Sequence, residues 1–375
     1  MKLWVRAVLR SCRSGILASA CLALFLAAPA LAQIDPKTAL LERAGWDALV
    51  AGQAREAAQA FREAIAGDPK NARLYIGAGT AAYLERRDAD AQEALEQALR
   101  LDPKLARARA LLGQVLYRSG DLAGAIRTYE TLADEAPDDR QALATLERWR
   151  REAELHTRMQ LAVGAHFTVS FEGPAEAQLA DQALESLERA YWRIGDTLTA
   201  YPIEPISVVL YTTEQFRDIT RAPSWAGGAY DGTIRIPMRG ALRNAKELDR
   251  VLTHEFTHAL VHTLAPRGVP IWLNEGLASA LESADLEWAE VRVGGAPAPV
   301  SLGALQNSFG GLAGNQAQLA YAVSALAVRR LIEDAGGFAI ANLLRDLGDG
   351  TDFEEAFAHR IQQSFADFQA SLAAP

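Results

Sequence analysis

The stretch LDRVLTHEFTHALVHTL, residues 248–264, decides the fold of one half of this chain. Its apolar residues recur at intervals of three and four, which predicts a buried helix. His254 and His258 stand four positions apart, so both imidazoles lie on one face of that helix. Two neutral ring nitrogens one turn apart can bind a single cation, and Glu255 beside them can reach a water at that cation.

A second stretch, WLNEGLA at residues 272–278, supplies a possible third ligand. It opens a predicted second helix after Pro266, Gly268 and Pro270, and it places Glu275 17 positions beyond His258. Two imidazoles and one carboxylate fill three corners of a tetrahedron and leave the fourth for water, as hydrolysis requires. The alternative is a helix whose two histidines are satisfied by hydrogen bonds in the core.

Together, HEFTH and WLNEG resemble the gluzincins, the peptidase clan of thermolysin and of the aminopeptidase-N type. The resemblance implies that His254, His258 and Glu275 bind Zn²⁺ and that Glu255 is the general base. It also implies peptide-bond hydrolysis without a covalent intermediate.

Other polar residues lie close to these motifs in the sequence. Tyr321 heads a predicted helix and is the candidate donor to the developing oxyanion, although a packed core aromatic is the alternative. His262 is interpreted as a helix-surface histidine or one that supports a ligand, since it lies about 12 Å of helix rise from His254. Ser279 and Glu282 could each orient a ligand, but surface solvation is the commoner explanation for Glu282.

The pattern around the motifs predicts an α+β domain over residues 161–375, whose expected fold is zincin-like. One strand is expected over the alternating residues 163–171, followed by a helix from Ala175 to Leu198. Two more strands are expected at 206–211 and 232–237. The run Trp225–Tyr230 is either an edge that pairs with an extended peptide or an ordinary hairpin. Residues 285–316 are expected to form a mobile loop over the cleft.

The first third of the chain repeats every 34 residues. Three coincident series carry this period: Gly45, Gly79 and Gly113; Ala57, Ala91 and Ala125; and Pro69, Pro103 and Pro137. These residues resemble the tetratricopeptide repeat, an all-α solenoid of paired helices. We expect three repeats plus a capping helix over residues 38–158. Such repeats either bind a protein or peptide in a groove or serve as a spacer for the second domain.

The first 32 residues are expected to be a cleavable secretory signal. Four basic residues precede an apolar run from Gly15 to Ala28, and the small-residue site Ala30-Leu31-Ala32 follows it. A membrane anchor is the alternative, but the run is shorter than the roughly 20 residues that span a bilayer. A lipid anchor at Cys21 is a weaker alternative. We therefore expect an exported protein, periplasmic or secreted, with no stable membrane insertion after cleavage.

Composition narrows the partners further. Both cysteines, Cys12 and Cys21, lie in the signal, so any metal must be held by His, Asp or Glu in the mature protein. The signal holds four of the 38 Lys and Arg and none of the 47 Asp and Glu, so its removal takes the net charge from −9 to −13. Nucleic acid is therefore an unfavourable partner, and a peptide or protein substrate is expected.

Two hypotheses follow from the sequence. The first is an exported zinc metallopeptidase whose repeats recruit a protein partner or substrate. The second is a non-catalytic binding scaffold in which the repeats bind a partner and the zincin-like domain is structural.

Overall fold

The computed structural model describes residues 36–173, 177–220, 228–238, 244–296, 300–306, 309, 312 and 314–372. The predicted signal at residues 1–32 lies outside the described residues. In the described ranges, no helix is both long and apolar enough to span a membrane.

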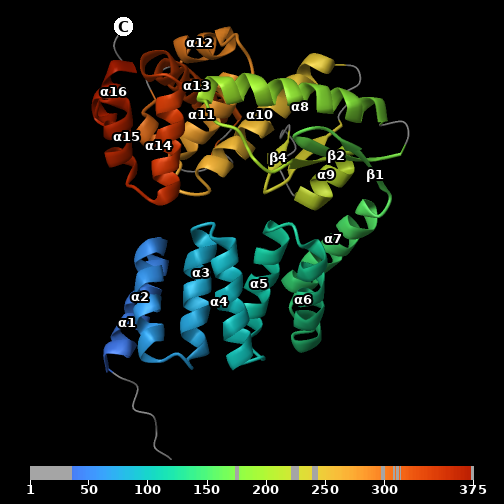
Figure 1. Ribbon diagram of the computed structural model, residues 1–375, viewed down its shortest axis with the longest axis vertical. Coiled ribbons are helices and arrows are strands. Elements are labelled where there is room, and N and C mark those ends of the chain that lie inside the picture. Colours follow the sequence, from blue (N-terminus) through green and yellow to red (C-terminus); the bar gives the residue numbers. More distant parts are fainter. Residues whose placement is uncertain are drawn as a thin grey trace, which may run out of the picture.

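Seven helices form the first half of the molecule, where they stand side by side (Figure 1). They are α1 (Pro36–Val50), α2 (Ala54–Gly67), α3 (Ala72–Leu84), α4 (Asp88–Leu101), α5 (Ala106–Arg118), α6 (Leu122–Glu135) and α7 (Arg140–His156). The first six make three antiparallel pairs, and α7 follows the last pair. The predicted all-α repeat solenoid is confirmed.

The repeated glycines have a packing function. A Cβ on Gly79 would stand 2.7 Å from the Leu95 side chain, and one on Gly113 would stand 2.4 Å from the Tyr129 ring. Gly45 meets the Phe61 ring in the same way. Because no side chain fits between the paired helices at these positions, glycine lets each pair approach closely.

The second half is built on a five-stranded mixed sheet in the order β1-β2-β3-β5-β4. The strands are β1 (Met159–Val163), β2 (Phe167–Glu172), β3 (Ile206–Tyr211), β4 (Ala229–Tyr230) and β5 (Ile234–Pro237). The central strands β2, β3 and β5 are parallel, and both edge strands are antiparallel to their neighbours. The predicted α+β class is confirmed.

The single strand expected over residues 163–171 was wrong. The chain forms two antiparallel strands there, with Val163 paired to Thr168. The backbone turns between them, where the amide of Gly164 donates to the carbonyl of Phe167 at 2.8 Å. Alternating apolar residues continue through the turn, so the period-two pattern alone does not reveal the reversal.

Strand β3 has a different helical layer on each face of the sheet. Val208 and Leu210 face the main core, which holds α8 (Ala177–Leu198) and α10 (Ala245–Leu264). Tyr211 faces a smaller core with Leu155 of α7 and with residues of α9 (Thr213–Thr220). The last helix of the repeat region therefore covers one face of the sheet.

The remaining helices pack beside α10, and the chain ends among them (Figure 1). They are α11 (Ile271–Leu281), α12 (Glu287–Gly294), the 3₁₀ helix η3 (Leu302–Leu305), α13 (Gly314–Ala335), α14 (Gly337–Asp349), α15 (Phe353–Ile361) and α16 (Phe365–Leu372). Residues 285–316 are therefore not a plain loop, because α12 and η3 lie within them. The predicted segment limits at 38–158 and 161–375 stay predictions.

A buried ionic network joins the two halves. Arg235 of β5 bonds to Glu152 of α7 at 2.7 Å, and these side chains are only 7% and 1% exposed. Tyr117 of α5 donates to the same carboxylate group at 2.8 Å, and Arg235 also donates to the Tyr211 hydroxyl at 2.8 Å. Burial raises the pKa of Tyr117 and Tyr211 above the usual tyrosine range, so both stay protonated donors. The repeats are thus fixed to the strand beside the edge of the sheet.

The network gives a stability prediction. Arg235→Met leaves the Glu152 carboxylate buried without its cation, and we expect unfolding free energy to fall by about 3–5 kcal/mol. The matched control is Arg151→Ala, which breaks an exposed pair with Asp218 and costs at most about 1 kcal/mol. Urea unfolding of both variants measures the difference. Equal effects of the two substitutions would contradict the account.

Candidate metal centre

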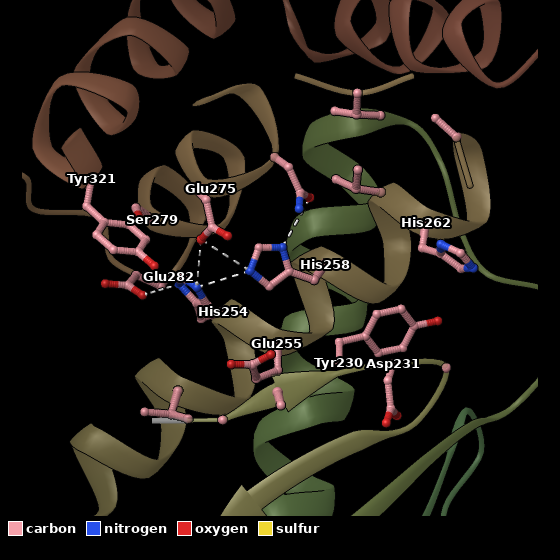
Figure 2. A pocket seen from close by; sticks show the side chains of 18 of the residues that line it. Tyr230, Asp231, His254, Glu255, His258, His262, Glu275, Ser279, Glu282 and Tyr321 are labelled. Atoms are coloured by element: carbon pink, nitrogen blue, oxygen red, sulfur yellow. Dashed lines mark hydrogen bonds and ion pairs between the residues drawn. The ribbon is translucent and has the colours of Figure 1, made fainter. Parts of the chain in front are cut away.

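Three side chains converge between α10 and α11 (Figure 2). They are His254, His258 and Glu275, whose ligand atoms all lie within 4.8 Å of one another. Both Nε2 atoms face Glu275 Oε2, from 3.8 Å for His254 and from 3.6 Å for His258, and the two Nε2 atoms are 3.2 Å apart. The structure therefore brings together the three residues proposed as metal ligands.

The dimensions of this cluster fit a small divalent ion. A tetrahedral Zn²⁺ with bonds of about 2.0–2.1 Å holds its ligand atoms roughly 3.3 Å apart. The observed separations of 3.2, 3.6 and 3.8 Å lie close to that value. Two nitrogens and one carboxylate oxygen form a donor set that suits zinc and leaves one position open.

The outer nitrogen of each histidine has its own acceptor. His254 Nδ1 donates to Glu282 at 2.7 Å, and His258 Nδ1 donates to the Asn274 side-chain oxygen at 3.1 Å. Such bonds fix the tautomer, so each Nε2 carries the lone pair that faces the centre. Both imidazoles are therefore oriented for ligation before a metal ion binds.

Of the two alternatives for Glu282, the structure supports the one in which it orients a ligand, and surface solvation, the commoner explanation, is wrong. Its side chain is only 6% exposed, and it also pairs with Arg250 at 2.9 Å. Asn274 was not singled out from the sequence at all. Asn274 and Glu282 stand at −1 and +7 from Glu275. This spacing does not show that both side chains reach the histidines, because the contacts depend on how α11 packs against α10.

The histidines and carboxylates of the cluster shift one another's pKa. Burial works against the charged form of His254, but the adjacent carboxylates of Glu275 and Glu282 outweigh burial and raise its pKa to about 10. Burial likewise opposes ionisation of Glu275, but the adjacent imidazoles of His254 and His258 hold its pKa well below the usual range. Since ligation requires neutral imidazoles, protons and a cation compete for these nitrogens.

Glu255 lies next to this cluster and close to the segment that enters the β4 edge strand (Figure 2). Its pKa is raised, because burial disfavours the carboxylate more than the two neighbouring histidines favour it. Gly228, just before β4, approaches so closely that a Cβ there would stand 2.6 Å from Glu255 Oε1. A side chain at this position would therefore displace the Glu255 carboxylate, and glycine leaves it in place. Of the predicted edge segment, Trp225–Gly227 lies outside the described residues.

Tyr321 reaches the cluster from α13 (Figure 2). Burial and the nearby carboxylates of Glu275 and Glu255 raise its pKa, so its hydroxyl stays a donor. The ring also packs edge-on against Phe309, with centroids 5.2 Å apart.

Helices α11 and α13 cross closely because Gly276 has no side chain, and a Cβ there would stand 2.5 Å from the Ser324 carbonyl oxygen. The glycine that follows Glu275 thus places Tyr321 beside it.

The cluster lies in a cleft of about 1050 Å³. One wall carries Tyr230 and Asp231 of the β4–β5 hairpin, and the repeats contribute Arg86, Asp88 and Arg118. His262 lies at that end and meets the Tyr230 ring edge-on, with centroids 5.6 Å apart. It is not among the clustered ligand atoms of the described residues, in agreement with the sequence prediction.

Family models match a part of each half of the chain. Residues 187–366 match the model of the Peptidase MA superfamily. Residues 43–91 and 83–149 match two models of the tetratricopeptide repeat. A search of curated proteins gave no match.

The solved structures similar to the chain include two tetratricopeptide-repeat domains. The first such domain of human RPAP3 is 19% identical, with a TM-score of 0.30, and the match covers 32% of this chain and 93% of that one. The corresponding domain of Spaghetti (RPAP3), bound to an HSP90 peptide, is 20% identical with a TM-score of 0.31 and coverages of 32% and 94%. An O-GlcNAc transferase mutant of Thermobaculum terrenum is 16% identical with a TM-score of 0.29 and coverages of 49% and 40%. The repeat assignment itself rests on the family models.

Glu282 gives the prediction for this site. We expect Glu282→Ala to weaken Zn²⁺ binding about 10- to 100-fold, because His254 loses the acceptor that fixes its ring. Glu247→Ala is the matched control, since Glu247 also pairs with Arg250 but does not touch His254. Competition with a fluorescent zinc chelator measures both affinities. An unchanged affinity in Glu282→Ala would refute the orienting role.

Proposed function

Residues 187–366 form a Peptidase MA superfamily domain behind tetratricopeptide repeats, and from this premise we propose that the protein is a zinc-dependent peptidase. The proposal is carried by the His254, His258 and Glu275 cluster, which fits a tetrahedral ion and lies in a large cleft with Glu255 alongside. A purely structural role for the two histidines does not account for a third ligand group whose atoms face the same point.

Each residue has a distinct part in the proposed reaction. His254, His258 and Glu275 would hold the ion, which when bound supplies a Lewis acid that polarises the scissile carbonyl and acidifies water. Glu255 accepts the proton of the attacking water and passes it to the leaving amine. Its raised pKa suits this part, because a carboxylate must first gain and then lose a proton near neutral pH.

Tyr321 is proposed to stabilise the developing oxyanion. Its protonated hydroxyl faces the cluster, and such donors are worth roughly 10²–10³ in kcat. Tyr321→Phe keeps the ring packed on Phe309 and removes only the donor. A fall in kcat with an unchanged KM supports the role, whereas an unaltered kcat would leave Tyr321 as a packed aromatic.

We further propose that the protein is exported after removal of residues 1–32 and that its repeats engage a peptide or protein. The basic and apolar segment at the N-terminus supports export. N-terminal sequencing of the protein recovered from its cells tests this, with Gln33 expected as the first residue. A first residue within the apolar run, or an intact Met1, would oppose it.

Glu255→Gln tests the reaction most simply. We expect hydrolysis of a peptide library to fall by about 10²–10⁴, because the proton acceptor is lost. Zinc content should not change, because the Glu255 carboxylate is not one of the three clustered ligand groups. Mass spectrometry of the digest and elemental analysis measure the two quantities.

The matched control is Glu290→Gln, an exposed carboxylate on α12, which should retain full activity. Cleavage by Glu255→Gln at the rate of the unaltered protein would overturn the proposal. If the unaltered protein binds zinc yet cleaves nothing, while a protein partner is captured equally by both forms, the scaffold hypothesis is favoured instead.

A further inference from the structure

The turns between the paired helices differ in one repeat. Each turn contains a residue with positive φ, and these residues are spaced 34 apart: Gly52 at 77°, Arg86 at 58° and Gly120 at 86°. Glycine adopts this left-handed conformation readily because it has no Cβ. The second repeat therefore places an arginine where the first and third have glycine.

An arginine is unfavourable in that conformation. The Cβ of an L-residue approaches the following carbonyl oxygen, and only Asn and Asp have a short polar group that compensates by bonding locally. Strain of this kind occurs at functional positions, although Thr199 and Gln362 also have positive φ and do not line the cleft of the metal centre. The position of the Arg86 side chain must therefore show whether it has a function that glycine cannot supply.

The position of Arg86 indicates such a function. Of the three residues with positive φ in these turns, Arg86 alone lines the cleft that holds the His254, His258 and Glu275 cluster. Asp88 and Arg118 line the cleft beside it, and together they form the wall contributed by the repeats. Gly232 at the tip of the β4–β5 hairpin touches this wall, since a Cβ there would stand 3.1 Å from the Arg118 carbonyl oxygen.

The charges around Arg86 are already paired. Arg118 Nε lies 2.9 Å from the Asp88 carboxylate, and Arg267 lies 3.7 Å from Glu85. Asp231 pairs with the buried Arg235 at 3.1 Å. Arg86 itself is exposed and makes no ion pair with any carboxylate in the part of the chain that the structure describes. It is thus a cation at the cleft without an anion.

The cation also affects the cleft electrostatically. Burial lowers the pKa of His262, and the charge of Arg86 lowers it further. His262 follows His258 by one helical turn, about 6 Å along the axis of α10. Since an extended peptide advances about 3.3 Å per residue, a group at this end belongs about two residues or more from a bond held at the centre.

We propose that Arg86 is a specificity residue that binds a carboxylate of the peptide substrate, about two residues or more from the scissile bond. The carboxylate is either an Asp or Glu side chain or the C-terminal group of the peptide. This deepens the proposed function and rests on it. The network of Arg235 and Glu152 holds the repeats against the sheet, so the distance from Arg86 to the metal centre is fixed.

The test compares peptide pools on the full-length zinc-loaded protein. Each pool is randomised except for Glu or Gln at one defined position, and each is made with a free and an amidated C-terminus. Cleavage is measured with the active protein, and binding is measured with Glu255→Gln. We expect the protein to favour carboxylate-bearing pools about three- to tenfold, with the preference weakened by salt.

Arg86→Gly is the informative variant, because glycine occupies the equivalent turns of the first and third repeats. The thermal stability of this variant should therefore not fall below that of the unaltered protein. The matched control combines Arg86→Gly with Gly120→Arg, which keeps the net charge and moves the arginine by one repeat. Gly120 has open space for a Cβ, and its positive φ of 86° imposes on the new arginine the kind of backbone strain that Arg86 carries in the parent. We expect both variants to lose the preference for carboxylate-bearing peptides, so that the ratio between the carboxylate-bearing and neutral pools falls to about one. Arg86→Lys should keep part of this preference, because it retains the positive charge.

The outcomes separate the two proposals. A preference that disappears on amidation identifies the C-terminal carboxylate, and one that follows Glu against Gln identifies a side chain. If cleavage occurs and Arg86→Gly keeps the same ratio, the inference is wrong while the proposed function stands. If nothing is cleaved but binding to Glu255→Gln discriminates through Arg86, carboxylate binding by Arg86 stands, while its role in cleavage specificity fails together with the proposed function. An absence of discrimination in both assays overturns the inference.

Discussion

The hydrogen bond from His254 Nδ1 to Glu282 is the interaction on which the site depends. It spans α10 and α11 at 2.7 Å and turns Nε2 of the same ring toward Glu275. The bond from His258 to Asn274 repeats the arrangement one turn along α10. With both rings fixed from behind, the ligand atoms are arranged by the fold itself, and little further ordering is needed when an ion binds.

Close helix packing makes this arrangement possible. Gly276 allows α11 to approach α13, and Gly228 allows the segment that enters β4 to lie close to Glu255. A methyl group at either position would have to displace backbone or the carboxylate itself. The site is therefore formed as much by the absence of side chains at two positions as by the chemistry of the residues around it.

The repeats are part of the same unit rather than a tethered appendage. Helix α7 covers one face of the sheet, and the buried pair of Glu152 and Arg235 fixes it there. Breaking a buried pair is costly, so the two halves should keep their relative placement. This is why the wall of the cleft formed by the repeats can act in recognition.

Much of this could be predicted from the sequence. The repeats and helix α10 have local periodicities, and His254 with His258 follows directly from helical geometry. The partner of His254 could not be assigned, since Glu282 reaches it only through the crossing of two helices. The role of Arg86 was equally hidden, because it depends on how the repeats dock. The β1–β2 reversal was missed because apolar alternation continues through its turn.

The most direct measurement is anomalous scattering at the zinc edge from crystals of the protein equilibrated with Zn²⁺. The account predicts a single peak in the cleft, about 2.0–2.2 Å from His254 Nε2, His258 Nε2 and the Glu275 carboxylate. A peak bound by other residues, or no peak between these three side chains, would contradict it.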